Sequence, residues 1–184
     1  RRQTVSVLGF SVWGPVVGSY VHWIADSARA LGVSHIYFCA RHEWLPQQAW
    51  HASALDKATG ISSSYLHVSR RSLNFAAAAI TCTRDYLSEQ ALQTLCHVFR
   101  DERLHDVLAR GDLLPLQPLV DDVLAHFGSL DRRICWSDGV KELQNCMLRH
   151  TESIYPVLQS KLFDVISYLC QEGLHKGKVA IVDV

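Results

Sequence analysis

The stretch SHIYFCARHEWLP, residues 34–46, decides the fold. Its apolar run, residues 36–40, is short, continuous and bounded by polar residues, which predicts a strand at about 35–40 that helices cover on both faces of a sheet. The run ends abruptly at Arg41, His42 and Glu43. We therefore expect a buried strand with charged side chains at its carboxyl end.

Helices and further strands are predicted on both sides of this run. Apolar residues at helical spacing predict helices over about 16–31 and 143–172, and Gly32 is suited to end the first. Short apolar runs predict two more strands, at 65–69 and 179–183. Helices that alternate with strands in this way are typical of an α/β layer fold, so the three strands should be parallel neighbours in one sheet.

The predicted fold class is therefore α/β, with a small parallel sheet flanked by helices in a Rossmann-like three-layer arrangement. We expect residues 1–184 to form one such domain. Apolar stripes at helical spacing continue through the middle of the chain, which predicts a helical insertion at about 84–135. The chain starts without methionine and stops at GKVAIVDV, within a predicted strand, so we expect a fragment of a larger protein.

Composition limits the classes of partner. Eighteen basic and eighteen acidic residues balance, so no overall field attracts nucleic acid, and any anion site must be local. No apolar stretch is long enough to predict a membrane span, and no signal peptide is recognisable. The six cysteines form no CxxC pair and lie in apolar patterns, which favours reduced thiols, no metal site and a cytoplasmic location.

The candidate site follows from the three strand exits. Ligands of open α/β sheets bind beyond the carboxyl ends of the strands. The residues found there are Arg41 after the first strand, Ser69, Arg70 and Arg71 after the second, and Asp183 after the third. Guanidinium groups bind phosphate or carboxylate oxygens in pairs, so these arginines predict an anion site. Asp183 could hold a metal such as magnesium, or accept a hydrogen bond from a sugar hydroxyl.

Two other interpretations of these residues stay open. Charged residues collect at strand exits of any α/β protein because solvent lies there, so the arginines could simply be solvated. His42 and Glu43 could act as an acid–base pair, but neighbouring side chains of an extended chain point to opposite sides. No P-loop, GxSxG or GxGxxG motif is present, and catalytic residues remain unassigned.

Three stretches, GPVVGSYVHWIADSARALGVSHIYFCARHEWLP (14–46), YLHVSRRSL (65–73) and KVAIVDV (178–184), carry a family resemblance. In this order they resemble the C-terminal region of large bacterial predicted haloacid-dehalogenase (HAD) superfamily hydrolases, many of them encoded among surface-polysaccharide and glycosyltransferase genes. Arg41 matches the first motif of that family, but His42 and Glu43 stand where the motif has Asp and Gly. The paired aspartates of the phosphatase lie earlier in such proteins and are not in this sequence.

Residues and resemblance together lead to two hypotheses. In the first, the chain is a domain of a larger HAD-like hydrolase or carbohydrate-pathway protein, and it binds a phosphorylated or nucleotide-linked sugar at the strand exits. In the second, it is a non-catalytic module that docks other domains of the same polypeptide through its helical segment.

Overall fold

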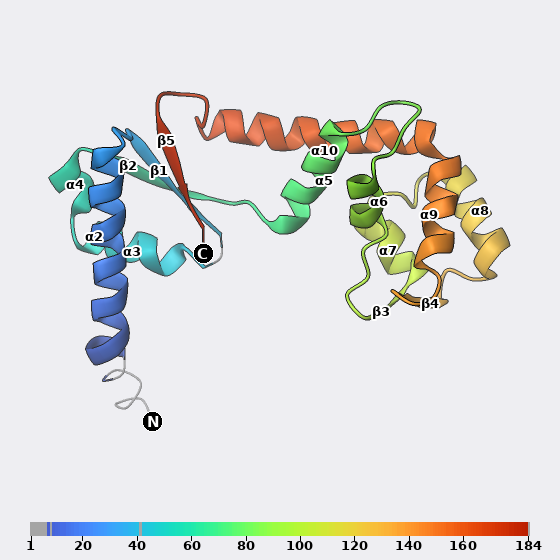
Figure 1. Ribbon diagram of the computed structural model, residues 1–184, viewed down its shortest axis with the longest axis horizontal. Coiled ribbons are helices and arrows are strands. Elements are labelled where there is room, and N and C mark those ends of the chain that lie inside the picture. The colour runs from blue at the N-terminus through green and yellow to red at the C-terminus, as the bar shows by residue number, and fades with distance from the viewer. Residues whose placement is uncertain (1–6, 8, 41, 184) are drawn as a thin grey trace. The chain divides into compact units, whose positions relative to one another are not determined.

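The computed structural model describes residue 7, residues 9–40 and residues 42–183, and it divides the chain into two compact units (Figure 1). The first unit contains Arg1–Ser69 and Leu169–Val184, and the second contains Arg70–Tyr168. The first unit is therefore discontinuous in sequence, and the second unit is inserted into it. The helical segment expected at 84–135 lies within the second unit.

A three-stranded parallel sheet organises the first unit. Its elements are the π-helical turn η1 (Gly9–Trp13), α2 (Gly14–Ala30), β1 (His35–Cys39), α3 (Trp44–Ala52), α4 (Leu55–Thr59), β2 (Ser62–Leu66) and β5 (Val179–Val182). The strand order is β2-β1-β5, and both pairings are parallel, with His35 opposite Ser62 on one side and Val179 on the other. The predicted parallel sheet and the α/β class are confirmed.

The second strand begins earlier in the sequence than predicted. Residues 62–64 are three serines, which are weak strand formers on their own, yet they pair with β1. The ring of His35 explains this, because its two nitrogens lie 2.6 Å from Ser62 Oγ and 2.9 Å from Ser64 Oγ. The polar partner comes from the neighbouring strand, so the sequence of residues 62–64 alone does not reveal it.

The core of the first unit lies on one face of this sheet. Val21 and Ile24 of α2 pack against Ile36 and Phe38 of β1. Trp50 of α3 completes the cluster and is fully buried. Burial of side chains of this size contributes about 1.5–3 kcal/mol each, so α2 and α3 are held to the sheet mainly by apolar contact.

Glycines end two of the helices of the first unit. Gly32 has φ +64° and follows α2, as predicted, and Gly60 has φ +72° after α4. The chain between these two glycines forms β1 and the helices α3 and α4. The break between α3 and α4 falls at Ser53 and Ala54, and Ala54 takes a left-handed conformation with φ +50°.

An apolar surface on η1 and α2 remains uncovered among the described residues. It consists of Phe10, Trp13, Val16 and Trp23, which are 85%, 59%, 57% and 64% exposed. Residues 13, 16 and 23 lie on one side of the helix because their spacing of three and seven matches its turns. Contiguous exposed apolar area of this kind is characteristic of interaction surfaces. We refer to these four residues as the α2 apolar surface.

The second unit is mostly helical. Its elements are α5 (Arg70–Ile80), α6 (Glu89–Leu95), β3 (Asp101–Arg103), α7 (Leu104–Arg110), α8 (Gln117–Phe127), β4 (Arg133–Cys135), α9 (Val140–Arg149) and α10 (Thr151–Gln171), whose last three residues belong to the first unit. Strands β3 and β4 pair antiparallel. One apolar cluster joins all these helices, with Leu108, Leu119 and Met147 among its fully buried members.

The long helix predicted over 143–172 is interrupted, although not at Pro156. The break lies at His150, between α9 and α10, while Pro156 is accommodated inside α10. Asp122 of α8 fixes the break, because its carboxylate accepts hydrogen bonds from Arg149 and lies 3.1 Å from His150 Nε2. The contact joins residues 28 positions apart, so local helical spacing does not reveal it.

Two further findings concern the chain as a whole. Among the described residues, none of the helices combines the length and the apolar character that crossing a bilayer requires. Each of the six cysteines is free of a disulfide, and Cys39, Cys82, Cys96 and Cys146 are buried. Burial raises the pKa of the Cys96 thiol, so this side chain packs as a small apolar group.

Candidate functional site

The predicted site residues fall in different parts of the molecule. Arg41 lies outside the described residues. Ser69 and Asp183 belong to the first unit, and both are exposed. Arg70 and Arg71 belong to the second unit, where they form the start of α5. Two groups of residues are therefore described separately: one at the carboxyl end of the sheet and one among the helices.

Four titratable side chains influence one another at the carboxyl end of the sheet. Cys39 is the last residue of β1, Asp183 follows β5, Glu43 precedes α3, and Tyr20 lies on α2. Burial raises the pKa of Glu43, and the negative charge of Asp183 raises it further, whereas His42 lowers it. Burial also raises the pKa values of Tyr20 and Cys39, with additional contributions from Glu43 and Asp183.

Glu43 is the unusual member of this group. Its side chain is 1% exposed, and its Oε2 atom is buried without a hydrogen-bond partner. A carboxylate in such a position is costly in its charged form, so the proton is retained to a higher pH than in solution. The group at this sheet edge can therefore hold a proton. The described residues contain no cluster of three or more His, Cys, Asp or Glu placed to hold a metal ion.

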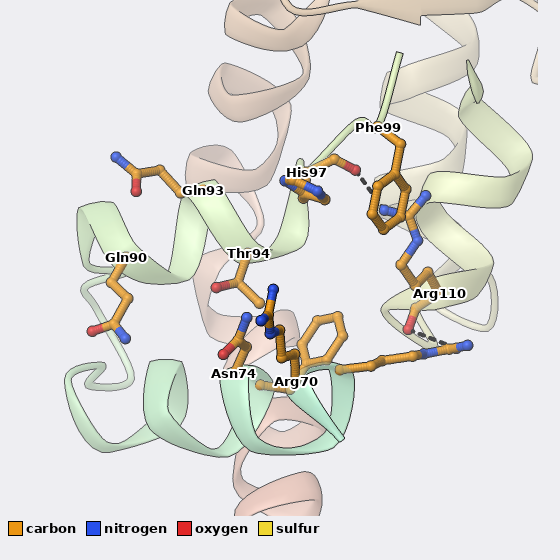
Figure 2. A pocket seen from close by; sticks show the side chains of 10 residues that line it. Arg70, Asn74, Gln90, Gln93, Thr94, His97, Phe99 and Arg110 are labelled. Carbon is orange, nitrogen blue, oxygen red and sulfur yellow. Dashed lines mark hydrogen bonds between the residues drawn. The ribbon is translucent and has the colours of Figure 1, made fainter. Parts of the chain in front are cut away.

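A pocket of about 650 Å³ lies among the helices of the second unit (Figure 2). Helices α5 and α6, the segment after α6, and the end of α7 supply its walls. The lining residues are Arg70, Arg71, Asn74, Phe75, Gln90, Gln93, Thr94, His97, Phe99 and Arg110. The volume is within the range of small-molecule sites, and most lining side chains are cationic or hydrogen-bonding.

Arg70 and Arg71 occupy the first turn of α5, which has no acidic residue. This placement is electrostatically unfavourable, because the N-terminus of a helix carries a partial positive charge that repels cations. No ion pair among the described residues includes either arginine. A bound anion would therefore be attracted by both guanidinium groups and by the helix end.

Arg110 is held by its neighbours instead of being free. Its guanidinium group donates to the His97 carbonyl oxygen at 2.6 Å and to the Glu102 carboxylate, and it lies 5.3 Å from the centre of the Phe99 ring. Glu102 neutralises this cation. Arg71 is partly engaged as well, since it donates to the Arg110 carbonyl oxygen at 3.3 Å.

Arg70 differs from these two arginines. It is exposed on the pocket wall, and it makes no hydrogen bond to another described residue of the second unit. Figure 2 shows its side chain directed into the pocket, between Asn74 and His97. Arg70 is therefore the cation of the pocket with the greatest freedom to bind an external anion.

The pocket residues beyond Arg70 and Arg71 were not among the predicted site residues. Part of the signal was present in the sequence: Gln90, Gln93, Thr94 and His97 recur at spacings of three and four, so they share the polar side of α6 and its extension. Arg110 gave no such signal. It reaches the pocket because α7 packs against α6.

Comparison of the chain with protein-family models, with curated proteins and with solved structures gave no match. Functional conclusions therefore depend on the geometry of the two units.

Proposed function

We propose that this protein binds a phosphorylated or nucleotide-linked sugar, and that the pocket of the second unit holds its phosphate. The proposal keeps the ligand class that the sequence predicts and the arginines Arg70 and Arg71. It extends the predicted set with Arg110, His97 and Thr94. The proposed biological setting is the one that the family resemblance implies: a larger HAD-like hydrolase or another protein of a carbohydrate pathway.

The observation that supports this function is an excess of uncompensated positive charge in a cavity. The whole chain has a formal net charge of zero, so anions are not drawn to its surface in general. Within the pocket, Glu102 compensates Arg110 only, and Arg70 and Arg71 form no ion pair with described residues. A phosphate provides the oxygens that both guanidinium groups can bind in pairs.

The neutral side chains of the pocket suit the rest of a sugar phosphate. Asn74, Gln90 and Thr94 offer amide and hydroxyl groups that both donate and accept hydrogen bonds, whereas the Gln93 amide already donates to Glu89 at 3.0 Å. Sugar hydroxyls require both kinds of partner. Inorganic phosphate would leave most of these groups unused, so we expect a phosphorylated sugar to bind more tightly than phosphate alone.

The test is calorimetric titration of the protein with hexose phosphates and with pyrophosphate. A charge-assisted hydrogen bond contributes about 1.5–3 kcal/mol, so Arg70→Ala should weaken binding roughly 10- to 150-fold. Arg71→Ala should have a smaller effect, because Arg71 also bonds to the Arg110 backbone and is less available to a ligand. Affinity should fall as salt concentration rises.

Arg84→Ala serves as the matched control. Arg84 is an exposed arginine of the same unit, it does not line the pocket, and its ion pair with Glu152 is solvent-exposed. Arg84→Ala changes the net charge by the same amount as Arg70→Ala. Its affinity for the ligand should stay within about twofold of the wild-type affinity. The proposal fails if no phosphorylated compound binds at millimolar concentration, or if Arg70→Ala and Arg84→Ala bind alike.

A second candidate function, docking, has an observation of its own. The α2 apolar surface exposes Phe10, Trp13 and Trp23, as an interaction surface would. If docking is the function, wild type should form an assembly. The double variant Trp13→Gln/Trp23→Gln should lose this assembly and therefore sediment more slowly. Unchanged sedimentation, together with phosphate binding in the pocket, would favour the first function.

A further inference from the structure

The pocket has amide, cationic and aromatic side chains in separate places. Figure 2 shows Gln90 and Gln93 on one side and Phe99 on the opposite side, with Arg70 between them. Amide groups, a cation and an aromatic ring thus follow one another across a cavity of about 650 Å³. A phosphate bound by Arg70 would leave space toward both ends.

The aromatic end of the pocket is held in place. Phe99 is 73% exposed, which is unusual for a large apolar side chain that has ordered neighbours. Arg110 lies over the ring at 5.3 Å, and the His97 ring meets it edge to face, with centres 4.7 Å apart and planes at 86°. Arg110 is itself fixed by Glu102 and the His97 carbonyl oxygen.

Such a ring can act as a stacking surface. A side chain held in one position loses little conformational freedom when a ligand binds, so an aromatic group stacked on it is bound more tightly. Bases of nucleotides stack on exposed aromatic rings of proteins without needing specific hydrogen bonds. Pyrophosphate has no group that would use Phe99 in this way.

We infer that the ligand of the pocket is a nucleoside diphosphate or its sugar conjugate, with the base against Phe99 and the phosphates at Arg70 and Arg71. The sugar end then lies toward Gln90, whose amide can bond its hydroxyls. This inference rests on the proposed function, since it places a base next to the phosphate site already described.

The experiment compares UDP, ADP and pyrophosphate by calorimetric titration, in wild type and in Phe99→Ala and Phe99→Leu. Stacking on an aromatic side chain corresponds to roughly 5- to 150-fold in affinity, so both nucleotides should bind tighter than pyrophosphate by a factor in this range. Phe99→Ala should remove that advantage and leave pyrophosphate binding unchanged. Phe99→Leu keeps apolar bulk without a π-face, so it should also lose most of the advantage.

Three results would overturn the inference, and they separate it from the proposed function. If wild type binds the nucleotides and pyrophosphate with equal affinity, the pocket has no base site, but the proposed phosphate site is not contradicted. A nucleotide preference that survives in both Phe99 variants would place the base elsewhere. Absence of binding for all three compounds would end the inference, and absence of hexose phosphate binding as well would end the proposed function. Far-ultraviolet circular dichroism of the Phe99 variants should match wild type, because Phe99 is not part of the apolar core.

Discussion

Gly139→Ala should lower the free energy of unfolding of the second unit by about 2–4 kcal/mol. Gly139 has φ +88°, a conformation that costs an alanine about 1–2 kcal/mol. A β-carbon at this position would also lie 2.5 Å from Ile134 Cγ2, closer than real contacts permit. Ile134 is 1% exposed and packed in the core, so it cannot move aside without disturbing its neighbours.

Gly128→Ala is the control for this prediction. Gly128 also has a positive φ, +79°, but a β-carbon there would meet no atom within 4 Å. It should cost only the backbone strain, about 1 kcal/mol. Urea denaturation followed by far-ultraviolet circular dichroism measures both variants. Equal losses of stability would show that Ile134 does not restrict residue 139.

Glu43→Gln should make the first unit more stable at neutral pH. Because burial raises the pKa of Glu43, the folded state binds its proton more readily than the unfolded state does. The stabilisation that this proton provides is fully present below the ordinary pKa of glutamate, about 4.3. It is lost as the pH rises through the higher pKa of the folded state. Glutamine carries no charge at any of these pH values, so Glu43→Gln should not lose this stability as the pH rises.

The expected gain in stability follows from Glu43 Oε2, which is buried without a hydrogen-bond partner. A buried polar atom without a partner costs about 1–3 kcal/mol, and a charged one costs more. We expect Glu43→Gln to recover about 1–2 kcal/mol at pH 8 and to change little at pH 4. Glu142→Gln, at an exposed glutamate of α9, should keep the pH dependence of wild type. If the stability of Glu43→Gln falls with rising pH as steeply as that of wild type, the prediction is wrong.

Tryptophan fluorescence is the appropriate probe for the Glu43 experiment. Trp13, Trp23, Trp44 and Trp50 belong to the first unit, and Trp136 belongs to the second. The fluorescence change on unfolding therefore reports mainly on the unit that contains Glu43. Circular dichroism weights the helices of the second unit more heavily, so the two signals together separate the stability of the units.

The sheet was predictable because its determinants are local. β1 and β5 are continuous apolar runs, and such runs form strands wherever helices can cover them. The start of β2 was missed because Ser62 and Ser64 depend on His35, which lies in another strand. The strand also ends at Leu66, earlier than the predicted residue 69, and Arg70 and Arg71 begin a helix.

The pocket was only partly predictable for a similar reason. Two adjacent arginines after an apolar run indicated an anion site, but nothing near them in sequence indicated Arg110 or Phe99. These residues meet Arg70 through the packing of α5, α6 and α7, which is a long-range property. Glu43 was considered only as the partner of His42, because its burial depends on how the helix after β1 packs.

The inserted second unit has a consequence for the order of folding. β1 and β5 are neighbours in the sheet, yet Ser34 bonds to a residue 144 positions later, at Lys178. A ribosome adds roughly 5–20 residues per second, so the continuous second unit is made before the last strand of the first unit. The second unit can therefore form its core during synthesis. The sheet of the first unit must wait with one edge of β1 unpaired until residues 179–182 have been made.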